Sequence, residues 1–339
     1  MPAQAAALVR PTPAGLYCEA GDFHIDPWRP VPRAVIPHAH ADHARRGSGR
    51  YLAAASCVPL LRARLGEDIE VAGLAWGEVV RLGGARVSLH PAGHVLGSAQ
   101  VRIEHGGETW VVTGDFKRDP DPTCEPFEAV RCDTLVTEAT FALPVYRWPE
   151  PATVAAAIHG WWEENRAAGR PSLLGCYALG KAQRVLAELA RFSDRPVYAH
   201  GAVLPIVDIY RAAGVRMLPV LPVEPRRRRS DWRGDLVIAP PAALGSPWAR
   251  RFAGASTGFC SGWMRIRGAR RRRGYDRGFV LSDHADWPSL VRTVAECGAT
   301  RVLTTHGQDA AFVRFLNEEA GVRAETLDTL FQGEEGAAS

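Results

Sequence analysis

Short hydrophobic runs, each closed by glycine, proline or aspartate, characterise residues 1–148 of the chain. Runs of this length bounded by turn-forming residues are typical of β-strands. We expect one helix in this half, at residues 58–65, and strands at residues 34–36, 86–90, 99–104, 110–113 and 134–137. This half of the chain is therefore predicted to be built mainly from sheets.

The pattern changes from residue 149 onward, where hydrophobic positions at helical spacing alternate with short hydrophobic runs. The predicted helices cover residues 152–167, 181–190 and 203–212, and the predicted strands cover residues 172–176 and 196–199. Such alternation indicates a small parallel α/β unit. A proline-containing linker is predicted at residues 219–225, and further strands and helices at residues 279–281, 287–296, 301–304 and 309–318.

The composition is that of a globular protein, with 46% hydrophobic and 23% charged residues. No hydrophobic run reaches the roughly 18 residues needed to span a bilayer, and no signal-peptide pattern is visible, so no membrane partner is expected. The seven cysteines are scattered and form no C-x-x-C pair. This usage favours a reducing compartment, and we expect a cytoplasmic protein.

Arginine is distributed unevenly, although the net charge is only +4. One run covers residues 226–229, and a second stretch contains Arg265, Arg267, Arg270, Arg271, Arg272, Arg273 and Arg277. Guanidinium groups match phosphate geometry, so these clusters suit a polyanion such as nucleic acid. The alternative is a solvated face: lysine occurs only twice, so the abundance of arginine is also explained by a biased genome composition.

A dense group of potential metal ligands follows the first predicted strand, and it consists of His38, His40, Asp42 and His43. Imidazole and carboxylate are the ligand pair that suits zinc or manganese. An extended segment points alternate side chains to opposite sides, so His43 faces away from the other three. A chain that turns here can serve two adjacent ions; the alternative is a histidine-rich surface loop.

Three more candidate ligands lie at loops or strand ends: His94, Asp115 and His306. A strand end next to glycine places a side chain at a rim, where the backbone can bend around an ion. Each residue also has a plain alternative, as a loop histidine, a turn aspartate or a helix-start residue. Together with the first group they supply a bridging carboxylate and enough imidazoles for a two-metal hydrolase.

The order of these motifs resembles the metallo-β-lactamase fold, and further motifs resemble its β-CASP nuclease branch. The similarity rests on the residues around Glu138, on the Gly-Lys-Ala-Gln helix start at residues 180–183, and on the segments containing His284 and His306. The segment at residues 261–264, followed by the arginines, resembles the bacterial ligase-associated DNA damage response exonucleases.

The resemblance implies an α/β fold: a metallo-β-lactamase αββα sandwich with an inserted small α/β β-CASP domain. Residues 1–148 and 256–339 would form the sandwich, and residues 149–255 the insert. The resemblance also implies two divalent metal ions, with Zn²⁺ preferred and Mn²⁺ as the alternative. The first would be held by His38, His40 and His94, the second by Asp42, His43 and His306, and Asp115 would bridge them.

The resemblance also implies roles beyond metal binding. Asp42, Asp115, Glu138 and His284 are the expected catalytic residues, with His284 paired to Glu138 and protonating the leaving oxygen. Asp26 would orient a ligand, and Asp22 is a rival in the same loop. The expected nucleic-acid contacts are Lys181 and Gln183 at a helix start, with Arg265, Arg267, Arg270, Arg271, Arg272 and Arg273.

Four functions are consistent with these motifs. The preferred one is a metal-dependent DNA exonuclease acting in repair alongside an ATP-dependent DNA ligase and a helicase. The second is an RNA nuclease of the mRNA 3′-end-processing type, which His306 favours within this family. A small-molecule metallohydrolase and a non-catalytic nucleic-acid-binding subunit are the alternatives from other classes; the arginines argue against the former and the intact ligand set against the latter.

Overall fold

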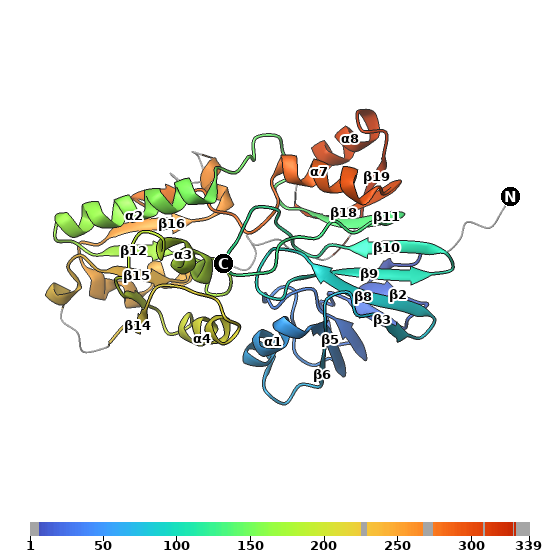
Figure 1. Ribbon diagram of the computed structural model, residues 1–339, viewed down its shortest axis with the longest axis horizontal. Helices are drawn as coiled ribbons and strands as arrows, with labels where there is room; N and C mark the ends of the chain where they lie inside the picture. The colour runs from blue at the N-terminus through green and yellow to red at the C-terminus, as the bar shows by residue number, and fades with distance from the viewer. Residues whose placement is uncertain (1–6, 225–228, 267–273, 308, 328, 330–339) are drawn as a thin grey trace. The chain divides into compact units, whose positions relative to one another are not determined.

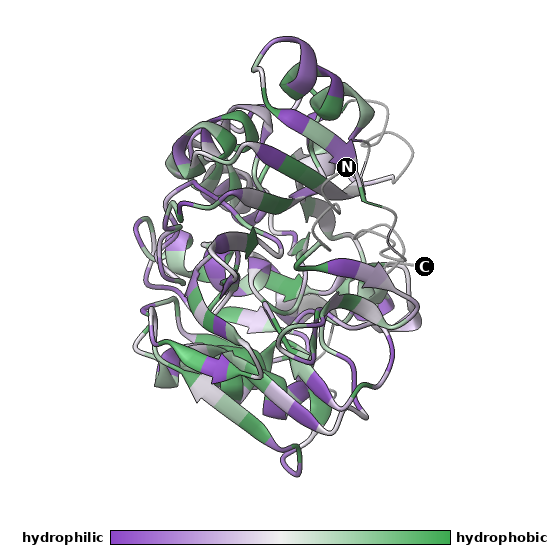
Figure 2. Cartoon of the chain, turned by 90° about the vertical axis from the view of Figure 1, so that its right-hand side faces the viewer, coloured by the Kyte–Doolittle hydropathy of each residue, from purple (hydrophilic) through white to green (hydrophobic). Residues whose placement is uncertain are grey.

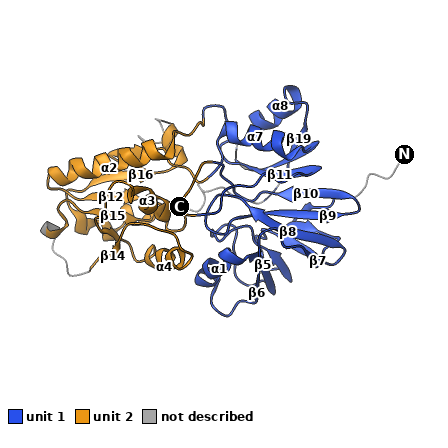
Figure 3. Cartoon of the chain, viewed as in Figure 1, with its two compact units in different colours: residues 1–118, 124–145, 284–337 blue, residues 119–123, 146–283, 338–339 orange. Residues whose placement is uncertain are grey.

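The chain forms two compact units (Figure 3). The computed structural model describes residues 7–224, 229–266, 274–307, 309–327 and 329. Unit 1 contains the described residues of Met1–Arg118, Cys124–Val145 and His284–Ala337. Unit 2 contains those of Asp119–Thr123 and Tyr146–Asp283.

Unit 1 begins with a six-stranded sheet in which the strands follow their order in the sequence (Figure 1). Pairing is antiparallel between the first three strands and parallel from β3 onward. The helix predicted at residues 58–65 is confirmed as α1 (Val58–Leu65), which follows a short 3-10 turn, Ala55–Cys57. The strands are β1 (Arg10–Thr12), β2 (Gly15–Cys18), β3 (Phe23–Ile25), β4 (Arg33–Val35), β5 (Arg50–Ala54) and β6 (Val71–Leu74).

The second sheet of unit 1 has seven strands in the order β19-β18-β11-β10-β9-β8-β7. Neighbours from β7 to β10 are antiparallel, whereas β10, β11, β18 and β19 are parallel. The predicted strands at residues 86–90, 99–104, 110–113, 134–137 and 301–304 are confirmed within it. Its strands are β7 (Val80–Leu82), β8 (Ala85–Pro91), β9 (Ala99–His105), β10 (Glu108–Val112), β11 (Thr134–Ala139), β18 (Arg301–Gly307) and β19 (Arg323–Thr326).

The centre of this sheet is buried on both faces. All six residues of β11 are buried, including the polar Thr134, Thr137 and Glu138, so this strand shows no alternation of buried and exposed positions. On one face, Val111 and Leu135 pack against helices α7 (Trp287–Cys297) and α8 (Ala310–Glu318), through side chains such as Leu290 and Phe312. Full burial of one such aliphatic side chain contributes about 1.5–3 kcal/mol. The strands at the centre are therefore firmly anchored.

The direction of the parallel strands decides where functional side chains can gather. The carboxyl ends of parallel strands lie at the same edge of a sheet, and irregular loops can bend there without breaking the ladder. In this sheet, Val112 is paired with Val136 and Glu138 with Thr305. The segments that follow β10, β11 and β18 therefore start close together.

Unit 2 is built around a six-stranded parallel sheet in the order β14-β13-β15-β12-β16-β17. The strands are β12 (Ser172–Gly175), β13 (Val197–Ala199), β14 (Val220–Pro222), β15 (Leu236–Ala239), β16 (Ser256–Cys260) and β17 (Arg277–Phe279). The helices are α2 (Pro151–Ala167), α3 (Lys181–Leu189), α4 (Leu204–Ala212) and α5 (Pro241–Leu244), with 3-10 turns η2 (Arg229–Trp232), η3 (Pro247–Phe252) and η4 (Gly262–Arg265).

Alternate residues of this sheet pack against different layers. Leu174 and Ile238 belong to the core with helices α2, α3 and α4. Their neighbours Leu173 and Val237 belong to a second core, with Trp232 from η2. The alternation of helices and strands predicted from residue 149 is thus a parallel sheet covered on both faces.

Unit 2 also differs from the sequence-based expectation. The segment predicted as a linker contains β14, which is an edge strand, and an edge tolerates prolines because one side of it lacks ladder partners. Strands β15 and β16 were not expected. Because β16 pairs with β12 and β17 with β16, the compact unit extends to Asp283, whereas the sequence pattern places the boundary at residue 255.

Hydrophobic and hydrophilic residues are interspersed along the strands and helices (Figure 2). Within the described residues, no helix is both long enough and apolar enough to cross a membrane. The arginines at positions 226–228, 267 and 270–273 lie outside the part of the chain that the structure describes.

One glycine shows how tightly β18 fits against β11. Gly307 has φ +84°, and a Cβ added there would lie 2.3 Å from the carbonyl oxygen of Ala139. Gly107 has a similar φ, +86°, but a Cβ there would meet nothing within 4 Å. Substitutions at these two glycines therefore distinguish the cost of backbone strain from the cost of a steric clash.

We predict that Gly107→Ala lowers the free energy of unfolding by about 1–2 kcal/mol, through backbone strain alone. Gly307→Ala should lower it by about a further 1–3 kcal/mol, because the strand must move away from Ala139. Urea unfolding of both variants measures the difference. Equal losses would show that the β11–β18 contact is not tight.

Candidate metal centre

Three imidazoles and one carboxylate of unit 1 point their ligand atoms at one another. His38 follows the end of β4, His94 lies in the loop between β8 and β9, and Asp115 follows the end of β10. The Nδ1 atom of His40 lies 3.1 Å from His38 Nε2 and 3.1 Å from His94 Nε2. Ligand atoms of His38, His40, His94 and Asp115 all lie within 4.8 Å of one another.

This arrangement fits a divalent cation better than a hydrogen-bond network. A neutral imidazole has one donor and one acceptor nitrogen, so three nitrogens and a carboxylate oxygen that converge cannot all satisfy one another. A cation accepts all four lone pairs. Burial lowers the pKa of His38 well below its usual value, and His43 adds to the effect. His38 is therefore neutral, as a metal ligand must be.

A second group adjoins the first through Asp115. His43 Nε2 lies 3.4 Å from Asp42 Oδ2 and 3.3 Å from Asp115 Oδ2. The same oxygen of Asp115 lies 3.5 Å from His38 Nε2. One carboxylate oxygen is thus shared by both groups, which is the geometry a bridging ligand needs. His306 lies on β18, and its side chain is outside the described part of the structure.

Asp26 holds the His43 ring in place. Its Oδ2 lies 2.5 Å from His43 Nδ1, and both side chains are buried. Burial raises the pKa of Asp26 to about 6, although the contact with His43 opposes the shift. Burial would lower the pKa of His43, but the carboxylates of Asp26, Asp115 and Asp42 raise it well above its usual value. With Nδ1 bound to Asp26, Nε2 faces Asp42 and Asp115.

Asp22, the other candidate for this role, lies elsewhere. Its side chain is 70% exposed, 3.8 Å from the guanidinium of Arg33, and it accepts a hydrogen bond of 3.0 Å from the hydroxyl of Tyr17. Asp22 and Asp26 both adopt a positive φ, +50° and +54°. Both are therefore turn residues, and only Asp26 reaches the imidazole group.

Gly114 lets two ligand segments approach each other. It has φ +56°, and a Cβ there would lie 2.7 Å from the Pro37 ring. Pro37 precedes His38 and Gly114 precedes Asp115. Any larger residue at 114 would push the two ligands apart.

Glu138 and His284 form a buried pair beside the imidazoles. His284 Nδ1 lies 2.8 Å from Glu138 Oε2, and the backbone N–H of Phe116 donates to Glu138 Oε1 at 2.7 Å. The rings of His94 and His284 lie 4.8 Å apart. Burial raises the pKa of Glu138, opposed by His284. The carboxylate fixes the His284 tautomer, so Nε2 is the atom that can exchange a proton with a substrate.

Asp115, Glu138 and His284 also bring ligand atoms within 4.8 Å of one another. Both oxygens of Glu138 already have nitrogen partners, from Phe116 and His284. A carboxylate used in this way is a poorer metal ligand than Asp115. Glu138 is therefore better placed to orient His284 than to bind an ion.

The helix start in unit 2 needs a different interpretation from the phosphate contact inferred from sequence. The Lys181 side chain is buried, and its Nζ lies 2.8 Å from Asp283 Oδ2. Gln183 is buried too; its Oε1 accepts from Gly180 N at 2.7 Å and its Nε2 donates to Ala178 O at 2.9 Å. Both are structural residues of unit 2. Of the expected arginine contacts, Arg265 is described, and it is exposed.

Sequence reasoning missed two groups around these sites. The backbone N–H of Phe116 carries no sequence signal, because every residue except proline has one. Arg184 is buried beside Asp121 and Asp283. Arg184 lies in the same helix start as Lys181, so its position in the sequence could have identified it.

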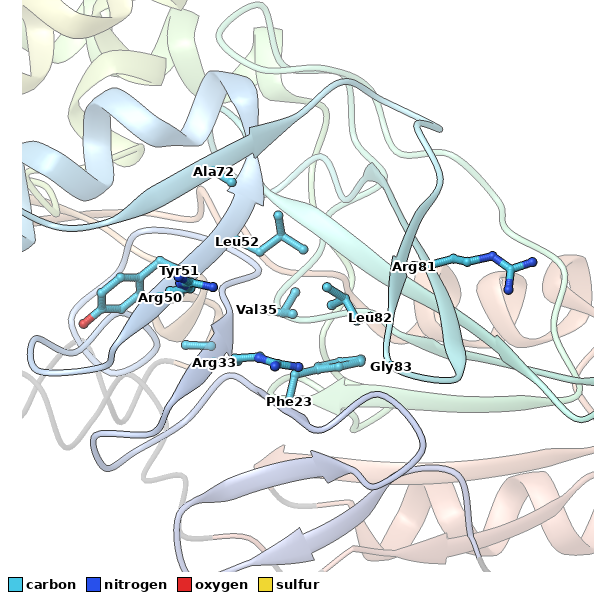
Figure 4. Close-up of a pocket in the computed structure, with 11 residues that line it drawn as sticks. Phe23, Arg33, Val35, Arg50, Tyr51, Leu52, Ala72, Arg81, Leu82 and Gly83 are labelled. Atoms are coloured by element: carbon cyan, nitrogen blue, oxygen red, sulfur yellow. The ribbon is translucent and has the colours of Figure 1, made fainter.

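A cavity of about 410 Å³ lies elsewhere in unit 1 (Figure 4). Its apolar lining includes Val35, Leu52 and Leu82, while Arg81 extends away from these side chains (Figure 4). Arg50 at its edge pairs with Glu70 at 2.8 Å. None of the residues expected to bind metal lines this cavity, so it is distinct from the metal centre.

No protein-family model matches the chain, but it is similar to several curated relatives, of which three are described. A probable DNA ligase of Opitutus terrae is 35% identical over 307 residues, covering 90% of this chain and 30% of that protein. The transcription termination factor FttA of Pyrococcus abyssi is 31% identical over 140 residues, covering 38% and 21%. Endoribonuclease ysh1 of Aspergillus fumigatus is 36% identical over 106 residues, covering 30% and 12%. The chain therefore spans less than a third of each relative.

A solved structure shares the fold. A protein of unknown function from Enterococcus faecalis superposes with a TM-score of 0.56, covering 82% of this chain and 76% of that one, at 14% identity. The relatives are named for work on nucleic acid: joining DNA, terminating transcription and cutting RNA. The buried ligand groups add a candidate site for divalent metal.

Asp22 and Asp26, which were expected to share a loop, lie at opposite ends of β3 and allow a matched test. We predict that Asp26→Asn weakens binding of one metal ion by about 10- to 100-fold, because His43 loses the partner that orients it. Asp22→Asn should leave metal binding unchanged; asparagine tolerates the positive φ at both positions. Metal content after dialysis against a competing chelator measures the effect. Equal loss in both variants would contradict the role of Asp26.

Proposed function

We propose that the protein is a metal-dependent DNA exonuclease that hydrolyses phosphodiester bonds with two divalent ions. The observation that carries the proposal is the shared oxygen of Asp115, which lies 3.5 Å from His38 Nε2 and 3.3 Å from His43 Nε2. Two adjoining ligand groups joined by one carboxylate suit a pair of ions and a phosphate between them.

The residues divide into two ligand sets. His38, His40 and His94 would hold one ion, Asp42, His43 and His306 the other, and Asp115 both. The chemistry that Zn²⁺ or Mn²⁺ supplies in such a site is activation of water and neutralisation of charge on the phosphate. Asp26 keeps His43 oriented through its 2.5 Å contact. Imidazole and carboxylate do not by themselves select between the two metals.

His284 acts on the leaving group in this proposal. Its Nδ1 is held by Glu138, and its ring lies 4.8 Å from that of His94, beside the ligands. A protonated His284 would give its Nε2 proton to the departing oxygen, and buried Glu138 would stabilise the imidazolium until then. The Phe116 N–H that donates to Glu138 keeps this carboxylate from turning away.

The two units suit the fold that the motifs imply. We propose that unit 1 is the αββα sandwich and that unit 2, which contains residues 149–255 with β16 and β17, is the inserted β-CASP domain. Support comes from the connectivity, since unit 1 resumes at His284 after the chain has passed through unit 2. The two sheets of unit 1 and the helices on the second one supply the layers.

DNA is the preferred substrate because the similarity to a DNA ligase extends over more of the chain than the similarity to an endoribonuclease. The match to a probable DNA ligase covers 90% of the chain, whereas the match to an endoribonuclease covers 30%. That likeness and the motif at residues 261–264 support a role in DNA repair with a ligase and a helicase, and the scattered cysteines support a cytoplasmic location. RNA is the second candidate, favoured by the endoribonuclease match and by His306.

An end-labelled oligonucleotide assay tests the substrate. With Mn²⁺ or Zn²⁺ present, we expect single-stranded DNA to shorten stepwise from one end, and an RNA of the same sequence to be cut more slowly. Blocking each end in turn identifies the end that is attacked. Cleavage of RNA alone would replace DNA by RNA as the substrate, and cleavage of neither would remove the nuclease proposal.

Single substitutions separate the acid from the ligands. His284→Ala should reduce kcat by about 100-fold or more while both ions stay bound, because His284 is a proton donor. Asp115→Ala should lose metal and activity together. His90→Ala is the control, since His90 contacts Glu128 and Ser88 away from the centre. Metal content and kcat are measured on each variant; loss of metal in His284→Ala would contradict the acid role.

A further inference from the structure

Four charged side chains are buried together inside unit 2. Lys181 and Arg184 lie on α3, and Asp121 and Asp283 lie on two segments distant in sequence. Lys181 Nζ is 2.8 Å from Asp283 Oδ2, Arg184 Nη1 is 3.3 Å from Asp283 Oδ1, and Arg184 Nε is 3.4 Å from Asp121 Oδ2. The four side chains are no more than 4% exposed. We call these residues the α3 ion cluster.

Burial of this kind does not by itself favour folding. Removing charges from water costs several kcal/mol for each ion, and well-packed apolar residues in their place are often equally stable. Burial would lower the pKa of Arg184, but Asp121 and Asp283 raise it. Asp119 adds to the same effect, so the buried cations are compensated by several carboxylates. The contacts that the cluster makes to separate segments point to a role in fixing those segments.

One of those segments leads directly into the proposed acid. Arg184 Nη1 donates to the backbone carbonyl of Ser282 at 2.6 Å, so the cluster holds both the backbone and a side chain of residues 282–283. His284 is the next residue. On its other side, within unit 1, Ala285 N donates to Phe116 O at 2.7 Å. The segment before His284 is therefore anchored inside unit 2, and the residue after it is anchored inside unit 1.

The other segment is held by the same arginine. Asp121 Oδ1 accepts hydrogen bonds from Thr123 N at 2.9 Å and Thr123 Oγ1 at 2.6 Å. Its second oxygen faces Arg184. Residues 119–123 begin four positions after Asp115. One helix start thus contacts the chain shortly after a proposed ligand and immediately before the proposed acid.

We propose that Lys181 and Arg184 are positioning residues, which act through Asp283 to fix the His284 imidazole for proton transfer. The inference rests on the proposed function, because it takes His284 as the acid. It assigns to the helix start a role in turnover that needs no contact with substrate. Misplacement of a reacting group by about 1 Å can cost about 100-fold in rate, so small shifts of residues 282–283 would matter.

The experiment must separate positioning from plain stability. Lys181→Met leaves the buried Asp283 carboxylate without its lysine partner, and should lower both thermal stability and kcat. The double variant Lys181→Met with Asp283→Asn removes both charges of that ion pair, so its melting temperature should return toward that of the wild type. Its kcat should stay about 10- to 100-fold low, because the link between α3 and residue 283 is gone. KM and metal content should stay unchanged.

Arg191→Met is the matched control. Arg191 lies just beyond the end of α3 and pairs with Glu188 at 3.2 Å, but its side chain is 59% exposed. Its loss should leave kcat within about twofold of the wild type, because exposed ion pairs contribute little. The wild type and these three variants are also compared by histidine NMR, with the His284 signal identified from His284→Ala.

The outcomes are distinct. Positioning predicts a single His284 signal in the wild type and a shifted or split one in the double variant, with kcat low. If kcat and the His284 signal recover together with the melting temperature, the cluster serves only stability and the proposal is overturned. If the wild type cleaves no nucleic acid, the proposed function fails on its own. The NMR comparison then still decides whether the cluster fixes His284.

Discussion

The metal centre depends on one carboxylate oxygen, Oδ2 of Asp115, which two groups of imidazoles share. Burial favours the neutral form of this acid, but His43 and His284 act against it and hold the pKa of Asp115 well below its usual range. The oxygen is therefore charged inside a buried site. A buried charge must be compensated, and the surrounding imidazoles do so only partly because His38 is neutral. Divalent cations would complete the compensation, which is why we interpret the cluster as a candidate metal centre.

The second sheet of unit 1 explains why such a site can be built with accuracy. Asp115 follows β10 and Glu138 lies on β11, and these parallel strands pair Val112 with Val136. Their shared edge brings the two carboxylates together, while packing on both faces fixes the strands from which they come. The loops beyond the strand ends are free to bend, and Gly114 permits the close approach to Pro37. The rigid strands thus fix where the ligand-bearing segments start, and the short loops allow their side chains to approach one another.

Unit 2 contains charged side chains that are buried as well as charged side chains that are exposed. A lysine at a helix start is equally suited to a phosphate and to a buried carboxylate, and the pattern along the chain is the same in both cases. Burial decides between them: Lys181 meets Asp283, and in our proposal this contact orients the chain before His284. A buried ion pair is sensitive to geometry, and this is a reason to expect such a pair beside a residue whose position controls a rate.

The amino-acid sequence by itself determined the ligand types, their order and most central strands, including β8–β11, because each depends on neighbours along the chain. It also identified Glu138 and His284, which the structure places 2.8 Å apart. Only the tertiary structure decided that Asp26 and not Asp22 reaches His43, that a proline-rich segment forms edge strand β14, and that Lys181 is buried. Those outcomes depend on contacts between residues far apart in the chain, and local patterns of polarity are the same whichever partner a side chain finally meets.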